Sequence, residues 1–193
     1  MVEAATRLFI RDGYVSTTVG AIASEAGVAV QSLYVGFGSK LGVLSAAFDI
    51  AIVGDTRPIP LLDRDWWKEL AAAPTGPHAL QIFVNEVCGI LARTQGLYAV
   101  IRAAAASEVG ELLVENKRQR YDGVRAVATQ LRSKPGFAPE IGIDVAADLL
   151  YALATEDSWG LLVGDRGWSS ETWNRWCVTL LSSTLFPGGQ DHL

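Results

Sequence analysis

The sequence has little charge and no long apolar run. Only 19% of the 193 residues are charged, and 21 acidic residues outweigh 16 basic ones to give a net charge of −5. A chain of this balance is not drawn to polyanions by its bulk charge. No stretch of about 18 apolar residues is free of charges or helix breakers, so we expect no membrane span. Alternation typical of strands is scarce, which favours an all-α fold.

Histidine and cysteine are also scarce. The two histidines are His78 and His192, and no HExxH, CxxC, GxSxG or phosphate-loop pattern is present. We therefore expect no enzyme activity, no cofactor and no metal site. Cys88 and Cys177 each lie in an apolar helical context. Free buried thiols in a reducing cytoplasm are the favoured interpretation, with a disulfide as the alternative.

Helical patterns account for most of what is present. In the first fifty residues, Thr18 and Ser39 are placed to cap helices that start at Val19 and Lys40, the second running to about Val53, and Gly27 is placed to end the first. A short helix is expected between them, over 30–35. Later helices are predicted over 66–72, 77–94, 97–107, 109–133, 140–163 and 170–185. The segment "GDTRPIPLLDRD" interrupts the pattern, so we expect one domain over 1–50 and another over 51–193.

Two short helices joined by a glycine turn are typical of a helix-turn-helix, which places its second helix in the major groove of DNA. Here the second helix begins with Gln31 and Ser32, whose side chains can hydrogen-bond base edges. Tyr34 and Lys40 carry groups that bind phosphates. The pattern therefore predicts a DNA-binding unit, although each of these residues alone is equally compatible with a solvated surface.

The segments "AATRLFIRDGY", "TTVGAIASEAGV" and "SLYVGFGSK" resemble, in order and spacing, the DNA-binding domain of the TetR family of one-component transcriptional regulators. The resemblance implies an all-α homodimer of about nine to ten helices. A three-helix DNA-binding domain would precede a larger ligand-binding and dimerisation domain. It further implies a repressor that a small effector of unknown identity releases from double-stranded operator DNA. The few polar groups of the interior helices indicate that this effector is mostly apolar. The DNA-contacting positions of relatives correspond to Thr18, Val19, Gly20, Val30, Gln31, Ser32, Tyr34, Gly36 and Lys40.

Several positions depart from the family pattern. Ala29 stands where relatives have a capping serine, Gln31 where a small residue is common, Gly36 where an aromatic or histidine meets phosphate, and Leu41 where an acid is usual. Met1 leads almost directly into the first helix, so the basic arm of relatives is expected to be missing or to precede it. Each missing phosphate contact lowers affinity. We therefore expect weak DNA binding, and the alternative is a dimeric ligand-binding protein of the same type whose DNA binding is weakened or lost.

The second part of the chain carries six tryptophans, and the segments "LLDRDWWKEL" and "DRGWSSETWNRWCVTLL" resemble TetR-like proteins of actinobacterial type. Broad apolar faces at the end of the chain favour a symmetric interface between two copies. The residues expected in that interface are Val145, Leu149, Ala152, Trp159, Trp173, Trp176 and Leu180. The residues expected around a ligand pocket are Phe83, Val87, Leu91, Leu97, Ile101, Tyr121, Val124 and Leu150, all equally suited to a core.

Overall fold

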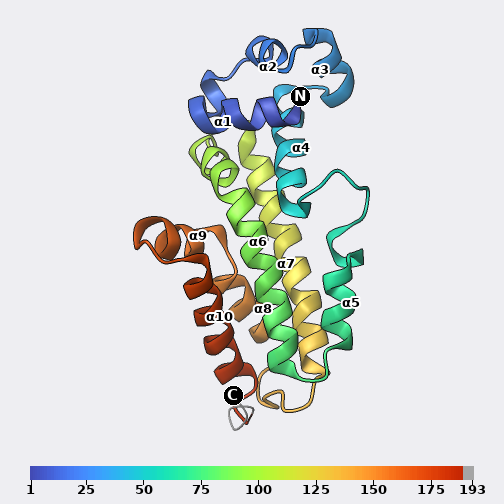
Figure 1. Cartoon of the computed structure of the whole chain (residues 1–193), viewed down its shortest axis with the longest axis vertical. Helices are drawn as coiled ribbons and strands as arrows, with labels where there is room; N and C mark the ends of the chain where they lie inside the picture. Colours follow the sequence, from blue (N-terminus) through green and yellow to red (C-terminus); the bar gives the residue numbers. More distant parts are fainter. Residues whose placement is uncertain (189–193) are drawn as a thin grey trace. The chain divides into compact units, whose positions relative to one another are not determined.

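The computed structural model describes residues 1–188, and all regular secondary structure within this range is helical (Figure 1), which confirms the predicted fold class. Its elements are α1 (Val2–Ser16), α2 (Val19–Ala26), α3 (Val30–Phe37), α4 (Lys40–Val53), η1 (Leu61–Asp63), α5 (Asp65–Ala72), α6 (Gly76–Ala103), α7 (Val109–Arg132), α8 (Ile143–Leu153), α9 (Glu156–Trp159), η2 (Gly160–Asp165) and α10 (Ser170–Leu185).

The chain forms two compact units. Unit 1 consists of Met1–Thr56 with Arg93–Lys117, and unit 2 consists of Arg57–Ala92 with the chain from Arg118 onward. Both crossings between the units fall inside a helix, one in α6 and one in α7. The two units are groups of residues that pack together, and their boundaries do not test function. The predicted functional division into 1–50 and 51–193 therefore remains a prediction.

The helix ends of unit 1 follow local sequence signals. The Thr18 hydroxyl accepts a hydrogen bond from the amide of Ala21 at 3.1 Å, and the Ser39 hydroxyl accepts one from Gly42 at 3.0 Å. Both predicted caps are therefore confirmed. Gly27 ends α2 with a left-handed φ of 67°, a conformation that glycine adopts without steric cost.

The core of unit 1 joins all four N-terminal helices to the parts of α6 and α7 that belong to this unit. Phe9, Ile22, Leu33 and Phe48 are fully buried there. Arg93 of α6 donates to the carbonyl oxygens of the last turn of α4, which have no partner within that helix. The helix-turn-helix, α2 and α3, therefore packs on an apolar core that lies within unit 1.

The core of unit 2 is built around tryptophan. Trp159 and Trp173 are buried and meet edge to face, with ring centroids 5.1 Å apart. Beside them Arg120 of α7 forms an ion pair with the buried carboxylate of Glu156. The Arg120 guanidinium also donates to the Tyr151 hydroxyl at 3.2 Å. This pair ties α7 to α8 and to the start of α9.

Two predicted helix boundaries are wrong. The helices expected over 77–94 and 97–107 form one continuous helix, α6, because Gly96 allows close packing and does not end the helix: a Cβ at this position would lie 2.9 Å from Ile10 Cδ1. The helix expected over 140–163 instead breaks after Leu153. Thr155 caps a new short helix by accepting from the amide of Ser158 at 3.0 Å, and the π-helical segment η2 follows.

Across residues 1–188 no single helix has the length and apolar character needed to cross a membrane. Helices α3 and α4 reach that length and apolar character only when they are counted as one segment, and they are bent by 66° relative to each other. Its most apolar side chains, Leu33, Leu44 and Phe48 among them, lie in the core of unit 1.

Two glycines give a direct test of the packing in unit 2. A Cβ at Gly76 would collide with the ring of Phe186, whereas a Cβ at Gly123 in α7 meets no atom within 4 Å. We expect Gly76→Ala to lower the free energy of unfolding by about 1–3 kcal/mol through overpacking. Gly123→Ala should raise it by about 0.5–1 kcal/mol through helix propensity. Urea unfolding measures both, and equal effects of the two substitutions would contradict the packing.

Candidate DNA-binding site

The nine residues predicted to contact DNA all lie in unit 1, on α2, on α3 and at the junction with α4. Val19 and Lys40 are half-buried. The other seven are exposed: Thr18, Gly20, Val30, Gln31, Ser32, Tyr34 and Gly36. The buried face of α3 is formed by Leu33. The helix therefore packs inward through this leucine and leaves its polar side chains accessible.

Lys40 has a role inside the domain. Its Nζ donates to the backbone carbonyl oxygens of Tyr14 at 2.8 Å and Thr17 at 3.0 Å. The ammonium also lies 4.2 Å from the centroid of the Tyr14 ring, within the range of a cation–π interaction. The Lys40 ammonium therefore joins the start of α4 to the end of α1, and its predicted contact with phosphate depends on the one N–H that these two bonds leave.

Tyr14 extends this contact to α6 and α7. Its hydroxyl donates a short hydrogen bond to the Glu108 carboxylate, in the connection between those helices. Burial raises the pKa of Tyr14, and the hydrogen bond to Glu108 raises it further. The phenol therefore stays protonated and remains a donor at physiological pH. Sequence patterns gave no sign of this link, which joins residues 94 positions apart.

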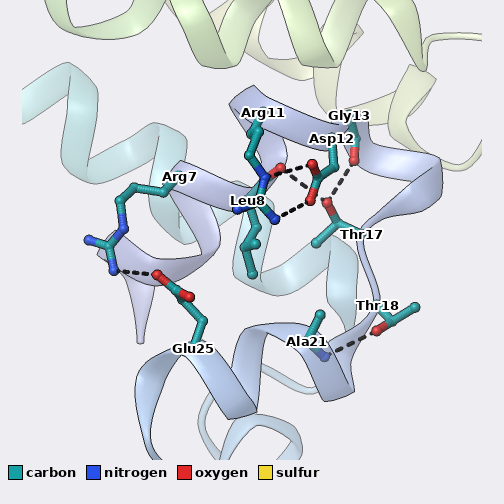
Figure 2. A network of polar contacts seen from close by, with 9 residues as sticks. All are labelled: Arg7, Leu8, Arg11, Asp12, Gly13, Thr17, Thr18, Ala21 and Glu25. Carbon is teal, nitrogen blue, oxygen red and sulfur yellow. Dashed lines mark hydrogen bonds and ion pairs between the residues drawn. The ribbon is translucent and has the colours of Figure 1, made fainter.

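The two arginines of the first fifty residues are also engaged within the domain (Figure 2). Arg7 forms an ion pair with Glu25 of α2 at 3.1 Å. Arg11 donates two hydrogen bonds, each 2.7 Å long, to the carboxylate of Asp12. Every basic side chain of residues 1–50 thus has a partner in its own domain, and the exposed surface there carries little uncompensated positive charge.

The helix starts differ in their capping. Figure 2 shows the Thr18 cap of α2 beside the Thr17 hydroxyl, which donates to the Gly13 carbonyl at 2.7 Å. At the start of α3, Ala29 provides no side-chain acceptor, as the sequence predicts. First-turn amides of a helix bind anions readily, so the start of α3 suits a phosphate better than a capped helix start does.

Two glycines on this surface have no packing reason to be glycine. A Cβ at Gly36 would meet no atom within 4 Å, and a Cβ at Gly20 would only reach ordinary contact with its neighbour Thr18. Both residues have ordinary helical backbone angles. Glycine within a helix destabilises it by about 0.5–1 kcal/mol relative to alanine. Their presence is consistent with close approach of another molecule to the backbone.

The residues predicted for a ligand pocket do not form one group. Six of them lie in or against the core of unit 2, namely Phe83, Val87, Leu91, Tyr121, Val124 and Leu150. Leu97 and Ile101 lie in the core of unit 1, because α6 is one helix that passes from one unit into the other. Only these six residues can therefore line a ligand pocket within unit 2.

The residues predicted for a dimer interface divide into exposed and buried sets. Val145, Ala152 and Leu180 are exposed, and Leu149 and Trp176 are half-buried. Trp159 and Trp173 are a wrong prediction, because they fill the core of unit 2 against each other. The exposed residues lie on α8 and α10, which are in contact.

A hollow of about 400 Å³ lies along α6 and α10, and none of the residues predicted for a ligand pocket lines it. Two of its lining residues, Gln81 and Asn174, belong to a network of amides, in which Gln81 donates to Asn85 at 2.8 Å and to Asn174 at 3.0 Å. Glu171, Arg175, Val178 and Thr179 complete its lining. Gln81 and Asn85 are one helical turn apart, but Asn174 lies 89 or more positions from either, so the sequence carries no signal of the complete network.

Comparison with known proteins gives a family match over the N-terminal helices. Residues 1–47 match the model of bacterial regulatory proteins, tetR family. No curated protein sequence matches the chain.

Solved structures match the whole chain. The fatty acid degradation regulator FadR from Bacillus halodurans has a TM-score of 0.72 at 21% identity, with 100% of this chain and 95% of that chain covered. FadR from Bacillus subtilis, in complex with stearoyl-CoA, has a TM-score of 0.73 at 16% identity, with 95% and 97% covered. NalD from Pseudomonas aeruginosa, the secondary repressor of the MexAB-OprM multidrug efflux pump, has a TM-score of 0.71 at 16% identity, with 97% and 94% covered. At these identities the likeness establishes the fold of the chain.

The internal role of Lys40 is testable without DNA. We expect Lys40→Met to lower the free energy of unfolding by about 2 kcal/mol, because two hydrogen bonds to a charged donor are lost. Lys68→Met is the matched control, since the Lys68 ammonium makes only an exposed ion pair with Asp65 and should change stability by less than about 0.5 kcal/mol. Urea unfolding compares the two, and equal stabilities would rule out a structural role for Lys40.

Proposed function

We propose, on the premise that this chain belongs through residues 1–47 to the tetR family of bacterial regulatory proteins, that it regulates transcription in the cytoplasm. A homodimer would bind double-stranded operator DNA through α2 and α3. A small, mostly apolar effector bound in unit 2 would release it, as expected of a repressor.

The outward surface of α3 is the observation that carries this proposal. Gln31, Ser32 and Tyr34 are exposed on a helix whose buried face is formed by Leu33. The side chains of a recognition helix must reach base edges, so they cannot be committed to packing. Together with the family match, this arrangement supports α3 as the recognition helix.

DNA contacts in the proposed complex come mainly from neutral groups. Arg7, Arg11 and Lys40 are engaged inside the domain, so phosphates would be bound by the first-turn amides of α3 and by the hydroxyl groups of Thr18 and Tyr34. Two copies of α3 would occupy successive major grooves, about 34–36 Å apart. Binding of this kind depends less on salt than binding through lysine and arginine.

The proposed effector site lies in unit 2. Phe83, Leu91, Val124 and Leu150 give this unit an apolar interior, and one neighbour of the same fold was solved with stearoyl-CoA. An effector that binds one arrangement of α6 and α7 more tightly would shift the population of that arrangement. Both helices run through both units without a break, which supports transmission along them.

A second candidate function follows from the charge. Because each basic side chain of residues 1–50 has an internal partner, the chain could instead be a dimeric ligand-binding protein of this family whose DNA binding is lost. Operator binding separates the two functions.

The first test of the proposed function uses fluorescence anisotropy with duplexes tiled across the DNA that flanks its own gene. We expect one duplex to bind, with a slope of log affinity against log salt of about −2 or shallower. If every basic side chain of residues 1–50 in both copies of a dimer contacted a phosphate, that slope would be about −5. Gly36→Ala should weaken binding at least about tenfold while leaving the fold as stable or more stable, since the added methyl group obstructs only the DNA.

Gly123→Ala is the control for that experiment, because it adds the same methyl group to a helix outside the DNA-binding surface. It should leave DNA affinity unchanged. If no duplex binds at low salt, operator binding through α3 is ruled out for these duplexes, and the result favours the second candidate function.

The dimer surface can be tested separately. Val145 is 54% exposed on α8, and Val145→Asp would place a charge in the proposed interface. We expect the variant to be monomeric in analytical ultracentrifugation. Its operator affinity should fall at least about tenfold, because the two copies of α3 are no longer linked when they bind the two half-sites of the operator. Val114→Asp, at a 70% exposed position of α7, should remain dimeric. A dimeric Val145→Asp protein would place the interface elsewhere.

A further inference from the structure

The exposed surface of α3 carries several apolar side chains. Val35 is 79% exposed, and Val30 and Tyr34 are exposed as well. Val35 follows Gln31 by one helical turn, so the two side chains lie next to each other on the face away from Leu33. Both valines present methyl groups to solvent, and Val35 contributes nothing to the core of unit 1.

The chemistry of this surface limits which bases it can read. Guanine is read most often by arginine or lysine, and cytosine by an acidic acceptor. Residues 30–37 contain neither type. Gln31 can hydrogen-bond both N6 and N7 of adenine, and apolar side chains such as those of Val30 and Val35 match the C5-methyl group of thymine. Gln31 and the two valines therefore favour A·T base pairs, whereas Ser32 can hydrogen-bond several bases and adds no preference.

The spacing of Gln31 and Val35 fits neighbouring base pairs. Side chains one turn apart on a helix are about 5–6 Å apart at their Cβ atoms, whereas successive bases on a strand are about 3.4 Å apart. When Gln31 contacts an adenine, Val35 is therefore within reach of a base one or two steps away. In a major groove, the exposed Val35 would gain apolar contact from the C5-methyl group of a thymine at that position.

We propose that α3 reads an A·T-rich half-site, in which Gln31 hydrogen-bonds an adenine and Val35 packs against the methyl group of a thymine one or two base pairs away. This assignment rests on the proposed function, because it requires α3 to enter the major groove. It also gives α3, whose residues 30–37 carry no charge, a source of affinity for DNA besides phosphate contacts.

The test begins by selecting duplexes from a random library with the full chain, which should enrich half-sites rich in A·T pairs. Each thymine of the selected site is then replaced by deoxyuridine, which removes only the C5-methyl group. At one position we expect wild-type affinity to fall about fourfold, the effect of removing one buried methyl group. Val35→Ala should bind the thymine and deoxyuridine duplexes equally at that position.

Two variants complete the experiment. Val114→Ala removes the same atoms from an exposed valine of α7 and should keep the wild-type response to deoxyuridine. Gln31→Ala should reduce the preference for adenine at one position by roughly 5- to 100-fold.

The possible failures are distinguishable. Selection of G·C-rich half-sites, or wild-type binding that is indifferent to every deoxyuridine, overturns the assignment while leaving the proposed function intact. If no duplex is enriched over the starting library, the proposed function fails and the assignment fails with it.

Discussion

The helix-turn-helix depends on the ammonium group of Lys40, which binds the carbonyl oxygens of Tyr14 and Thr17. These carbonyls belong to the end of α1 and the residue after it, and Thr18 follows directly as the cap of α2. The contact therefore fixes where α2 begins relative to α4. Since α3 packs against both helices, its outward face is set by the same contact. Tyr14 anchors this arrangement to the connection between α6 and α7 through Glu108.

In the proposed function, the same contact limits how unit 1 would bind DNA. A lysine that holds two carbonyls is a weaker partner for phosphate, and Arg7 and Arg11 are paired with acidic neighbours. In the proposed complex, affinity would therefore come to a larger extent from base edges, which would make recognition more dependent on sequence and less on ionic strength.

The local features of this structure could be predicted, and the features that depend on distant residues could not. The caps at Thr18 and Ser39 and the end of α2 at Gly27 follow from the chemistry of one or two neighbouring residues. The exposed face of α3 follows from its period. The role of Lys40 depends on carbonyl groups more than twenty positions away. The helix end expected after residue 94 is absent: α6 continues through Gly96, whose close packing against Ile10 involves a residue 86 positions earlier.

The tryptophans of unit 2 show the same limit and alter the proposed interface. An apolar stripe at the end of a chain predicts that its side chains are buried. It does not predict whether they are buried by the same chain or by a second copy, and Trp159 and Trp173 are buried by the chain itself. The predicted interface residues that remain at least partly outside are Val145, Leu149, Ala152 and Leu180, together with the half-buried Trp176. Two of the three tryptophans predicted there are lost to the core, and aliphatic side chains contribute less on burial than tryptophan. In the proposed dimer, association would therefore be weaker than an interface centred on the tryptophans would give, and operator occupancy would depend more steeply on the concentration of the chain.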